Sequence, residues 1–470
     1  MANIASYLND LKSGNTSAKS TVEGFLSRIE EHQHLNAFLE VFGDEALARA
    51  EEIDQKIAEG NAGRLAGVVI GIKDNICFEG HKVSGSSKIL EGFESLYSST
   101  AVEKLLAEDA IIIGRLNCDE FAMGSSNENS AFGNALNPVD TERVPGGSSG
   151  GSAVAVAANL CHVSLGSETG GSVRQPASFC GIVGVKPTYG RVSRHGLLAF
   201  ASSFDQIGPF ANNVEDAALV LEVISGADEF DSTSSSKPVT DLQPKAIEKK
   251  KFAYLKECVE NDALDGSIRS SFMEMVEALK AEGHEVEAVD FPMLDHLIPT
   301  YYVLTTAEAS SNLSRYDGMR YGYRSEKATD LESTYKLSRA EGFGTEVKRR
   351  IMLGTFVLSS GYYDAYYGKA QKVRRLLKET TEKLFSEYDF VLSPTTPDVA
   401  FKFGENADDP IKMYLEDIYT VLANLTGVPS VSVPLGKKDG LPYGIQVMAD
   451  QFEEQEMFSA AKLLHALCNK

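Results

Sequence analysis

The chain has 470 residues, of which 43% are hydrophobic and 24% are charged, which is sufficient for a large buried core. Its formal net charge of −22 argues against a stand-alone nucleic-acid-binding protein, because an acidic surface repels a phosphate backbone. The six cysteines form no CxxC pair, and the sequence contains neither a signal-peptide pattern nor an apolar stretch of about 18 residues. We therefore expect a soluble, cytoplasmic protein with reduced thiols.

Helical spacing dominates the first 65 residues, which we expect to pack as a helical segment on the rest of the chain. Val22, Phe25, Leu26 and Ile29 fall at i, i+3, i+4 and i+7, which predicts one buried stripe. A second helix is predicted through EALARAEEIDQKIAEG, ending at a glycine.

The period changes at GVVIGIKDN, residues 67 to 75, which reads as a buried strand whose end presents Lys73. A helix and a strand follow in TAVEKLLAEDAIIIGRLN, and residues 228–244 lack periodicity and predict a surface loop. Later strands are predicted at FAYLKE, HEVEAVDF, FVLSP, SVSVPL and GIQVMA. This alternation predicts an α/β fold: one domain over residues 1–470 with a single large mixed sheet covered on both faces by helices.

The motifs for metal and nucleotide chemistry are missing from the sequence. It has no HExxH motif and no Cys/His set at metal-ligand spacing, and GGSSGGS lacks the Lys-Ser/Thr of a P-loop. We therefore expect no metal site and no cofactor in this chain. His162 falls in a strand pattern and is expected to have a packing role.

Two glycine-rich loops carry serines, at residues 146–152 (GGSSGGS) and 168–176 (ETGGSVRQP). The run from Gly147 to Ala177 resembles the signature of the amidase signature family, and GIKDN resembles that family's lysine motif. The acidic position of the second loop is more often Asp in the family, whereas here it is Glu168. The resemblance implies the amidase signature fold and an amide-cleaving activity.

Carried over by position, the resemblance implies a catalytic triad of Ser172 as nucleophile, Ser148 as bridging serine after a cis peptide bond, and Lys73 as base. It also implies an oxyanion hole formed by the backbone of Thr169, Gly170, Gly171 and Ser172. A serine hydroxyl needs a base within hydrogen-bond reach, and lysine serves only when neutral. Burial among aliphatic residues lowers a lysine pKa, provided that Asp74 points away from the ammonium. Cys180 is a rival nucleophile, but it has no basic neighbour in the sequence and is expected to be a packing thiol.

Three further segments, residues 186–209, 300–322 and 341–367, resemble the glutaminase subunits of tRNA-dependent amidotransferases within that family. That resemblance implies glutamine as substrate, with Arg350 on its α-carboxylate, Asp417 on its α-ammonium and Tyr301 lining the pocket. The alternative for VKRRIMLG is a solvated helix face, so that one of Arg349 and Arg350 is only a surface residue. Asp417 likewise falls on a helical pattern where an exposed Asp is common.

The resemblance implies two other subunits as partners. A kinase-like subunit would bind the tRNA and activate Glu-tRNA(Gln) with ATP and magnesium, and it would use ammonia from this chain to form Gln-tRNA(Gln). A small subunit would cover the interface, and tRNA would reach this chain only through its partner. The alternatives are a free-standing amidase acting on small or aryl amides, and a non-catalytic scaffold.

Overall fold

The computed structural model describes residues 3–406 and 410–468 of the chain. Its centre is one sheet of eleven strands, with the order β1-β3-β2-β4-β6-β5-β10-β11-β9-β7-β8. In that order, the strands are β1 (Phe38–Val41), β3 (Ile111–Leu116), β2 (Val69–Lys73), β4 (Val163–Glu168), β6 (Gln206–Ala211), β5 (Val183–Lys186), β10 (Ser430–Lys438), β11 (Leu441–Met448), β9 (Phe390–Pro394), β7 (Lys251–Leu255) and β8 (Glu285–Val289). Parallel and antiparallel pairs both occur, so the predicted mixed sheet is confirmed.

Helices cover both faces of the sheet, as predicted. The helices of the first half are α1 (Ile4–Lys12), α2 (Ala18–Glu31), α3 (Gly43–Glu59), α4 (Thr100–Ala107), α5 (Gly150–Ala157), α6 (Arg174–Cys180) and α7 (Val214–Ile224). Those of the second half are α8 (Lys256–Glu260), α9 (Gly266–Ala281), α10 (Leu294–Asn312), α11 (Leu331–Gly342), α12 (Thr345–Val357), α13 (Lys369–Glu387), α14 (Pro410–Leu415), α15 (Val421–Thr426) and α16 (Glu454–Cys468). Single turns of 3-10 helix lie at η1 (Gln33–Leu35), η2 (Lys88–Leu90), η3 (Glu120–Ala122) and η4 (Leu313–Arg315), and a π-helix lies at η5 (Asp364–Gly368).

Alternate residues of the central strands enter two separate cores. Val69 packs with α2, α3 and α5, whereas its neighbour Ile70 packs on the opposite face, where α4, α7 and α16 lie. This follows from the two-residue period of a strand, which sends successive side chains to opposite faces. Both faces are covered, so β2 is buried along its whole length.

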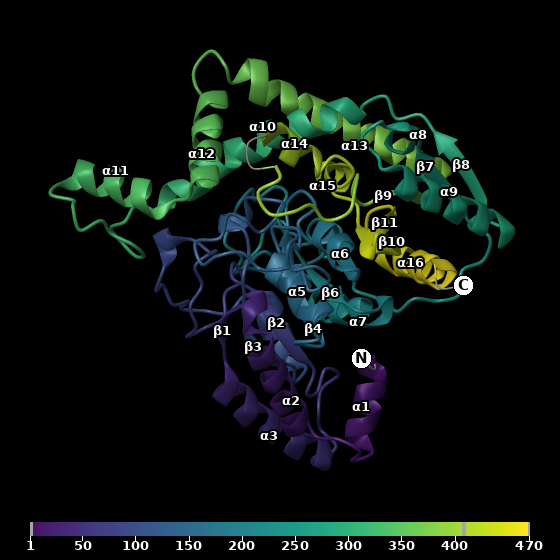
Figure 1. The fold of residues 1–470 in the computed structure, drawn as a ribbon, viewed down its shortest axis with the longest axis horizontal. Coiled ribbons are helices and arrows are strands. Elements are labelled where there is room, and N and C mark those ends of the chain that lie inside the picture. Colours follow the sequence, from purple (N-terminus) through teal and green to yellow (C-terminus); the bar gives the residue numbers. More distant parts are fainter. Residues whose placement is uncertain (1–2, 407–409, 469–470) are drawn as a thin grey trace.

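The predicted N-terminal helices form, with Val22, Phe25 and Ile29 buried and Leu26 half-buried. Residues 228–244 hold no helix or strand, and Asp231 and Leu242 within them are buried. The helices α10, α12 and α13 gather at the upper end of the molecule in Figure 1, and α11 extends beyond the body. The loops of the candidate site lie beneath them.

Candidate active site

Lys73 ends the buried strand β2 and is 0% exposed. Its Nζ donates hydrogen bonds to Ser148 Oγ at 2.7 Å, Ser149 Oγ at 2.9 Å and Ser167 Oγ at 2.9 Å. The two residues between which the sequence predicts proton transfer, Lys73 and Ser148, are therefore in direct contact. The sequence analysis did not single out Ser149 or Ser167, although Ser149 lies in the same glycine loop as Ser148.

Burial lowers the pKa of Lys73 to about 8, although the nearby Cys118, Asp119, Asp205 and Glu168 act in the opposite direction. Removal from water disfavours the ammonium form, and the surrounding groups are mostly hydroxyls that bind either form. The arrangement thus brings the lysine into the range where it can accept a proton near neutral pH.

Asp74 follows Lys73 directly and points away from it, as expected. Its carboxylate accepts hydrogen bonds from Ser84 N and Ser86 N and pairs with Arg115 Nη1 at 2.7 Å. Because the Asp74 carboxylate pairs with Arg115, it does not stabilise the ammonium form of Lys73.

The first glycine loop runs into the N-terminus of α5, and its Gly147–Ser148 peptide bond is cis, as the family resemblance implied. A Cβ atom on Gly147 would lie 2.1 Å from Asp119 Oδ2 and 2.7 Å from Ser126 N. Glycine is therefore required at this position by a close approach of the chain, and Ser148 is fully buried beside it.

Ser172 lies in the second glycine loop, is 7% exposed and forms no hydrogen bond through its hydroxyl with any described residue. Its backbone carbonyl accepts from Ser149 N at 3.3 Å, so the two serine loops are in contact. In the same described part of the chain, the backbone N–H groups of Gly170, Gly171 and Ser172 have no hydrogen-bond partner. Within that part of the chain these amides are not used by other groups, so they remain available for the predicted oxyanion hole.

Two buried carboxylates, those of Glu168 and Asp205, anchor the second glycine loop (residues 168–176). Glu168 accepts hydrogen bonds from Val173 N and Arg174 N at the start of α6 and pairs with Arg174 at 2.5 Å. Glutamate at this position therefore has a defined role, which is to anchor the loop to α6. Asp205 accepts from Thr169 Oγ1 at 2.6 Å, and burial raises its pKa to about 7. Sequence reasoning missed Asp205, because the contact joins residues that are 36 positions apart.

Cys180 and His162 both have the packing roles that we expected. Cys180 is buried, and burial raises its thiol pKa, so the reactive thiolate is disfavoured. His162 accepts from Val69 N at 3.0 Å through Nδ1 and contacts the ring of Phe25, and burial lowers its pKa to about 3.

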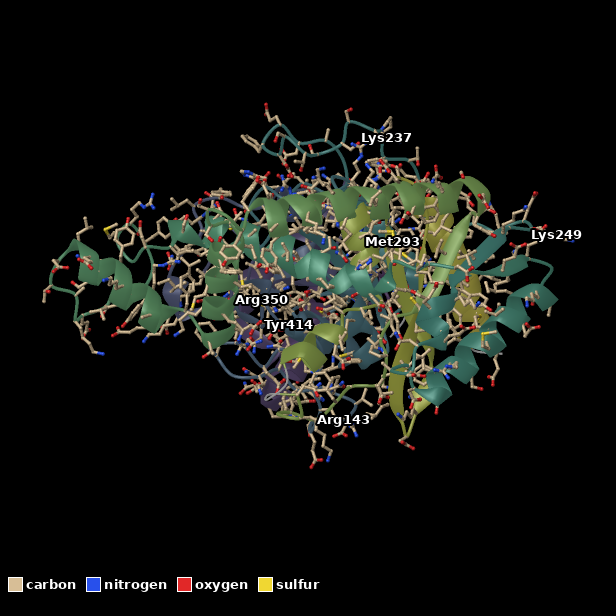
Figure 2. All side chains as sticks on the ribbon, turned by 90° about the horizontal axis from the view of Figure 1, so that it is seen from above. Arg143, Lys237, Lys249, Met293, Arg350 and Tyr414 are labelled. Carbon is tan, nitrogen blue, oxygen red and sulfur yellow. The ribbon has the colours of Figure 1, made fainter. Side chains whose placement is uncertain are left out.

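Arg350 is 4% exposed, whereas the Arg349 side chain is 49% exposed. The Nε of Arg350 donates to Glu346 Oε1 at 2.8 Å, one helical turn earlier. Its guanidinium faces the rings of Tyr302 and Tyr414 with centroids at 5.2 and 5.8 Å, and Figure 2 shows Arg350 next to Tyr414. Both arginines line a cavity of about 280 Å³, but Arg350 is buried in its wall whereas about half of the Arg349 side chain is exposed.

Asp417 is also buried and lies between α14 and α15, so it is not on an exposed helix face. Its carboxylate accepts from Ser125 Oγ at 3.1 Å and from Tyr302 OH at 3.3 Å, and burial raises its pKa to about 7. Tyr302, which the sequence did not single out, links the two charges because its ring faces Arg350 and its hydroxyl contacts Asp417.

Tyr301 packs against the oxyanion loop, since a Cβ on Gly170 would lie 2.4 Å from its hydroxyl oxygen. Tyr301, Arg350 and Asp417 therefore surround the side of the site that faces α10 and α12. Within residues 3–406 and 410–468, no group of three or more His, Cys, Asp or Glu side chains could hold a metal ion. In the same residues, no helix is both long and apolar enough to span a membrane.

Comparison with known proteins gives consistent matches over nearly the whole chain. The family model described as Amidase matches residues 20–458. The glutamyl-tRNA(Gln) amidotransferase A-subunit of Clostridium botulinum is 52% identical, covering 94% of this chain and 92% of that protein. The crystal structure of the A-subunit of the enzyme of that name from Thermotoga maritima is 40% identical with a TM-score of 0.78, covering 94% of this chain and 90% of the other. A peptide amidase from Stenotrophomonas maltophilia is 28% identical with a TM-score of 0.84, covering 100% and 97%.

Proposed function

The chain belongs to the amidase family, and from this we propose that it is the glutaminase subunit of a tRNA-dependent amidotransferase. The observation that carries the proposal is a buried cation and a buried carboxylate, Arg350 and Asp417, joined through Tyr302 beside the serine–lysine site. A free amino acid has one carboxylate and one ammonium group, so this pair fits glutamine better than it fits an apolar amide.

The reaction begins with the neutral form of Lys73. A pKa of about 8 leaves roughly a tenth of this amine neutral at pH 7, against well under roughly 0.1% for an ordinary lysine. Lys73 takes a proton from Ser148 Oγ, which takes one from Ser172 Oγ as that oxygen attacks the side-chain amide carbon of glutamine.

The amides of the second glycine loop then stabilise the negative oxygen of the tetrahedral intermediate. As the carbon–nitrogen bond breaks, the proton returns through Ser148 to the leaving nitrogen, and ammonia is released. A γ-glutamyl ester on Ser172 remains, and water attacks it by the same steps to give glutamate and the free serine.

Glutamine is held by its α-groups while this happens. Because Arg350 uses its Nε for Glu346, its terminal nitrogens are the ones that would bind the α-carboxylate. Asp417 must be ionised to bind the α-ammonium, and the positive charge of glutamine favours that form.

The ammonia serves a partner subunit that converts ATP-activated Glu-tRNA(Gln) to Gln-tRNA(Gln). ATP and magnesium belong to that subunit, tRNA is held by it, and a further small subunit completes a heterotrimer in the cytoplasm. The acidic composition of this chain supports such a division, because the chain would handle no phosphate backbone itself.

The test of this proposal is ammonia release from glutamine by the purified chain, with and without its partner subunits. We expect hydrolysis of glutamine that increases in the complex. Full activity on bulky apolar amides, with none on glutamine even in the complex, would instead establish the alternative of a free-standing amidase.

The nucleophile is tested separately. Ser172→Ala is expected to abolish the acyl-enzyme that mass spectrometry detects after mixing with substrate, because the oxygen that forms the ester is gone. Cys180→Ala serves as the matched control from the same segment and is expected to form the ester as the wild type does. The reverse pattern would make Cys180 the nucleophile.

A further inference from the structure

Exposed apolar side chains are concentrated on one part of the surface. Among the described residues, seventeen large hydrophobic side chains are exposed, and eleven of them lie between residues 319 and 376. Six of these belong to α12, η5 and the turn between them: Met352, Leu353, Phe356, Tyr362, Tyr363 and Tyr366. Scattered exposed apolar residues are ordinary, but a continuous group of them marks a surface that another molecule covers.

Three of the six residues, Phe356, Tyr362 and Tyr366, form a cluster of rings. The ring of Phe356 lies 4.4 Å from that of Tyr362 and 5.8 Å from that of Tyr366. Tyr366 also lines an apolar groove of about 440 Å³ between α10, η5 and α13, with Pro299, Val303, Ala370 and Val373. A groove continuous with an aromatic patch is a shape that receives the apolar side of a helix.

The charge around this patch is opposite to that of the whole chain. From the start of α12 to the end of α13, residues 345–387 contain nine Lys and Arg and five Asp and Glu, a net charge of +4, so the rest of the chain carries −26 to give the total of −22. Lys369 lines the groove, and Lys372 follows one helical turn later on α13; both are exposed and have no carboxylate partner among the described residues. Basic side chains around an apolar centre complement an acidic partner.

We propose that this surface, called here the docking face (Met352, Leu353, Phe356, Tyr362, Tyr363, Tyr366, Lys369 and Lys372), binds an acidic amphipathic helix of a partner subunit of the amidotransferase. The proposal rests on the proposed function. A protein partner fits better than an RNA, because Met352, Leu353 and the groove lined by aliphatic side chains suit the apolar side of a helix, and the charge of −26 on the rest of the chain repels phosphates.

The docking face lies on the back of the helix that carries the glutamine cation. Met352 is two residues after Arg350, which turns it about 200° round the helix axis, and it is 72% exposed whereas Arg350 is buried; α12 rests directly on α10. A partner that covers the outer side of α12 holds the inner side in place, so docking is expected to lower the KM for glutamine as well as to form the complex.

The experiment compares variants of the full chain, with the partner subunits added singly and then together. In Phe356→Glu with Tyr366→Glu, carboxylates replace the apolar centre, and we expect the affinity measured by sedimentation to fall at least tenfold. Leu96→Glu is the matched control, because Leu96 is 82% exposed and lies outside the docking face, and it should assemble as the wild type does. Lys369→Glu with Lys372→Glu should slow association and weaken its dependence on salt.

Hydrolysis of glutamine by each isolated variant shows that its active site is intact. Assembly of the Phe356→Glu, Tyr366→Glu variant with wild-type affinity would overturn the docking proposal and leave the proposed function standing. Unchanged assembly together with a loss of binding to a tRNA transcript would overturn it in favour of an RNA surface. If the wild-type chain binds neither partner subunit, both proposals fail.

Discussion

The pKa of Lys73 determines the pH range in which the proposed active site can act. Its side chain is fully buried, and the three hydroxyls that it contacts can accept from the ammonium or donate to the free amine. Burial therefore lowers the pKa of Lys73, because no carboxylate among the described residues contacts its Nζ and favours the ammonium form. A lysine in this setting is a proton acceptor whose strength is controlled by its distance from water.

A pH profile tests this directly. Because the neutral amine is the active form, kcat/KM for glutamine should rise with pH through about 8, and it should fall more steeply below about 7, where Asp417 also takes up a proton. The measurement is initial-rate ammonia release between pH 6 and 9.5. A profile that is flat over that range would rule out Lys73 as the base.

Arg350 and Arg349 are neighbours with different environments, which makes them a matched pair. Arg350→Ala should raise the KM for glutamine by roughly tenfold to a hundredfold, since a charge-assisted hydrogen bond contributes about 1.5–3 kcal/mol. Arg349→Ala removes a side chain that is 49% exposed and should raise the KM much less, although Arg349 lines the same cavity and pairs with Glu346. Equal effects of both substitutions on glutamine hydrolysis would contradict the assignment of Arg350 to the substrate.

At the scale of elements, α12 and α10 position the glutamine pocket together. Tyr301 and Tyr302 lie on α10, and Arg350 lies on α12. The two helices touch at Gly354, where an added Cβ would lie 1.9 Å from the carbonyl oxygen of Thr306. That contact is with backbone, so a larger residue must move one helix away from the other.

Gly354→Ala is therefore expected to destabilise the protein by about 1–3 kcal/mol and to raise the KM for glutamine, because α12 carries Arg350 with it. Gly24→Ala is the control in another helix, where the new Cβ meets only Arg28 Nη1 at 3.7 Å. There alanine should stabilise by up to about 1 kcal/mol. Urea unfolding and glutamine kinetics measure both. A Gly354→Ala protein with wild-type stability and KM would show that the contact has no positioning role.

At the scale of the molecule, buried carboxyl groups lie around the site. Burial raises the pKa of Asp119 to about 6 and those of Glu120, Asp205 and Asp417 to about 7. The folded chain thus retains protons that the unfolded chain loses above about pH 4–5, so these groups stabilise the fold at low pH and lose that effect as pH rises through 6 to 7. His162 has the opposite effect on stability. Its pKa is lowered in the fold, so below about pH 6.5 the unfolded chain binds a proton there that the folded chain does not.

His284, His465 and the buried Lys186 also have lowered pKa values and act in the same direction as His162. Each of them contributes less between pH 5.5 and 7.5 than each of the three carboxyls with a pKa of about 7, so the free energy of unfolding should be larger at pH 5.5 than at pH 7.5. Urea titrations at the two pH values measure it. Glu120→Gln, which keeps an oxygen for Gly344 N, should reduce the difference. Greater stability at pH 7.5 would mean that these carboxyls are ionised in the fold with little cost.

The sequence by itself determined the parts that depend on local pattern. Strand and helix periods predicted the mixed sheet and its covering helices. The resemblance of the two serine loops and of GIKDN to the family signature implied Lys73, Ser148 and Ser172, because that signature is a local run of residues. The roles of these residues stay predictions until the kinetics above are measured.

Only the tertiary structure decided what depends on contacts between distant segments. It separated Arg350 from Arg349, buried Asp417, and brought in Ser167, Asp205 and Tyr302, none of which carries a local signal. It also packed both α12 and α13 against α10, so that a basic and aromatic surface forms in an acidic chain. Burial and charge environment arise when distant segments pack together, so a spacing pattern along the chain does not contain them.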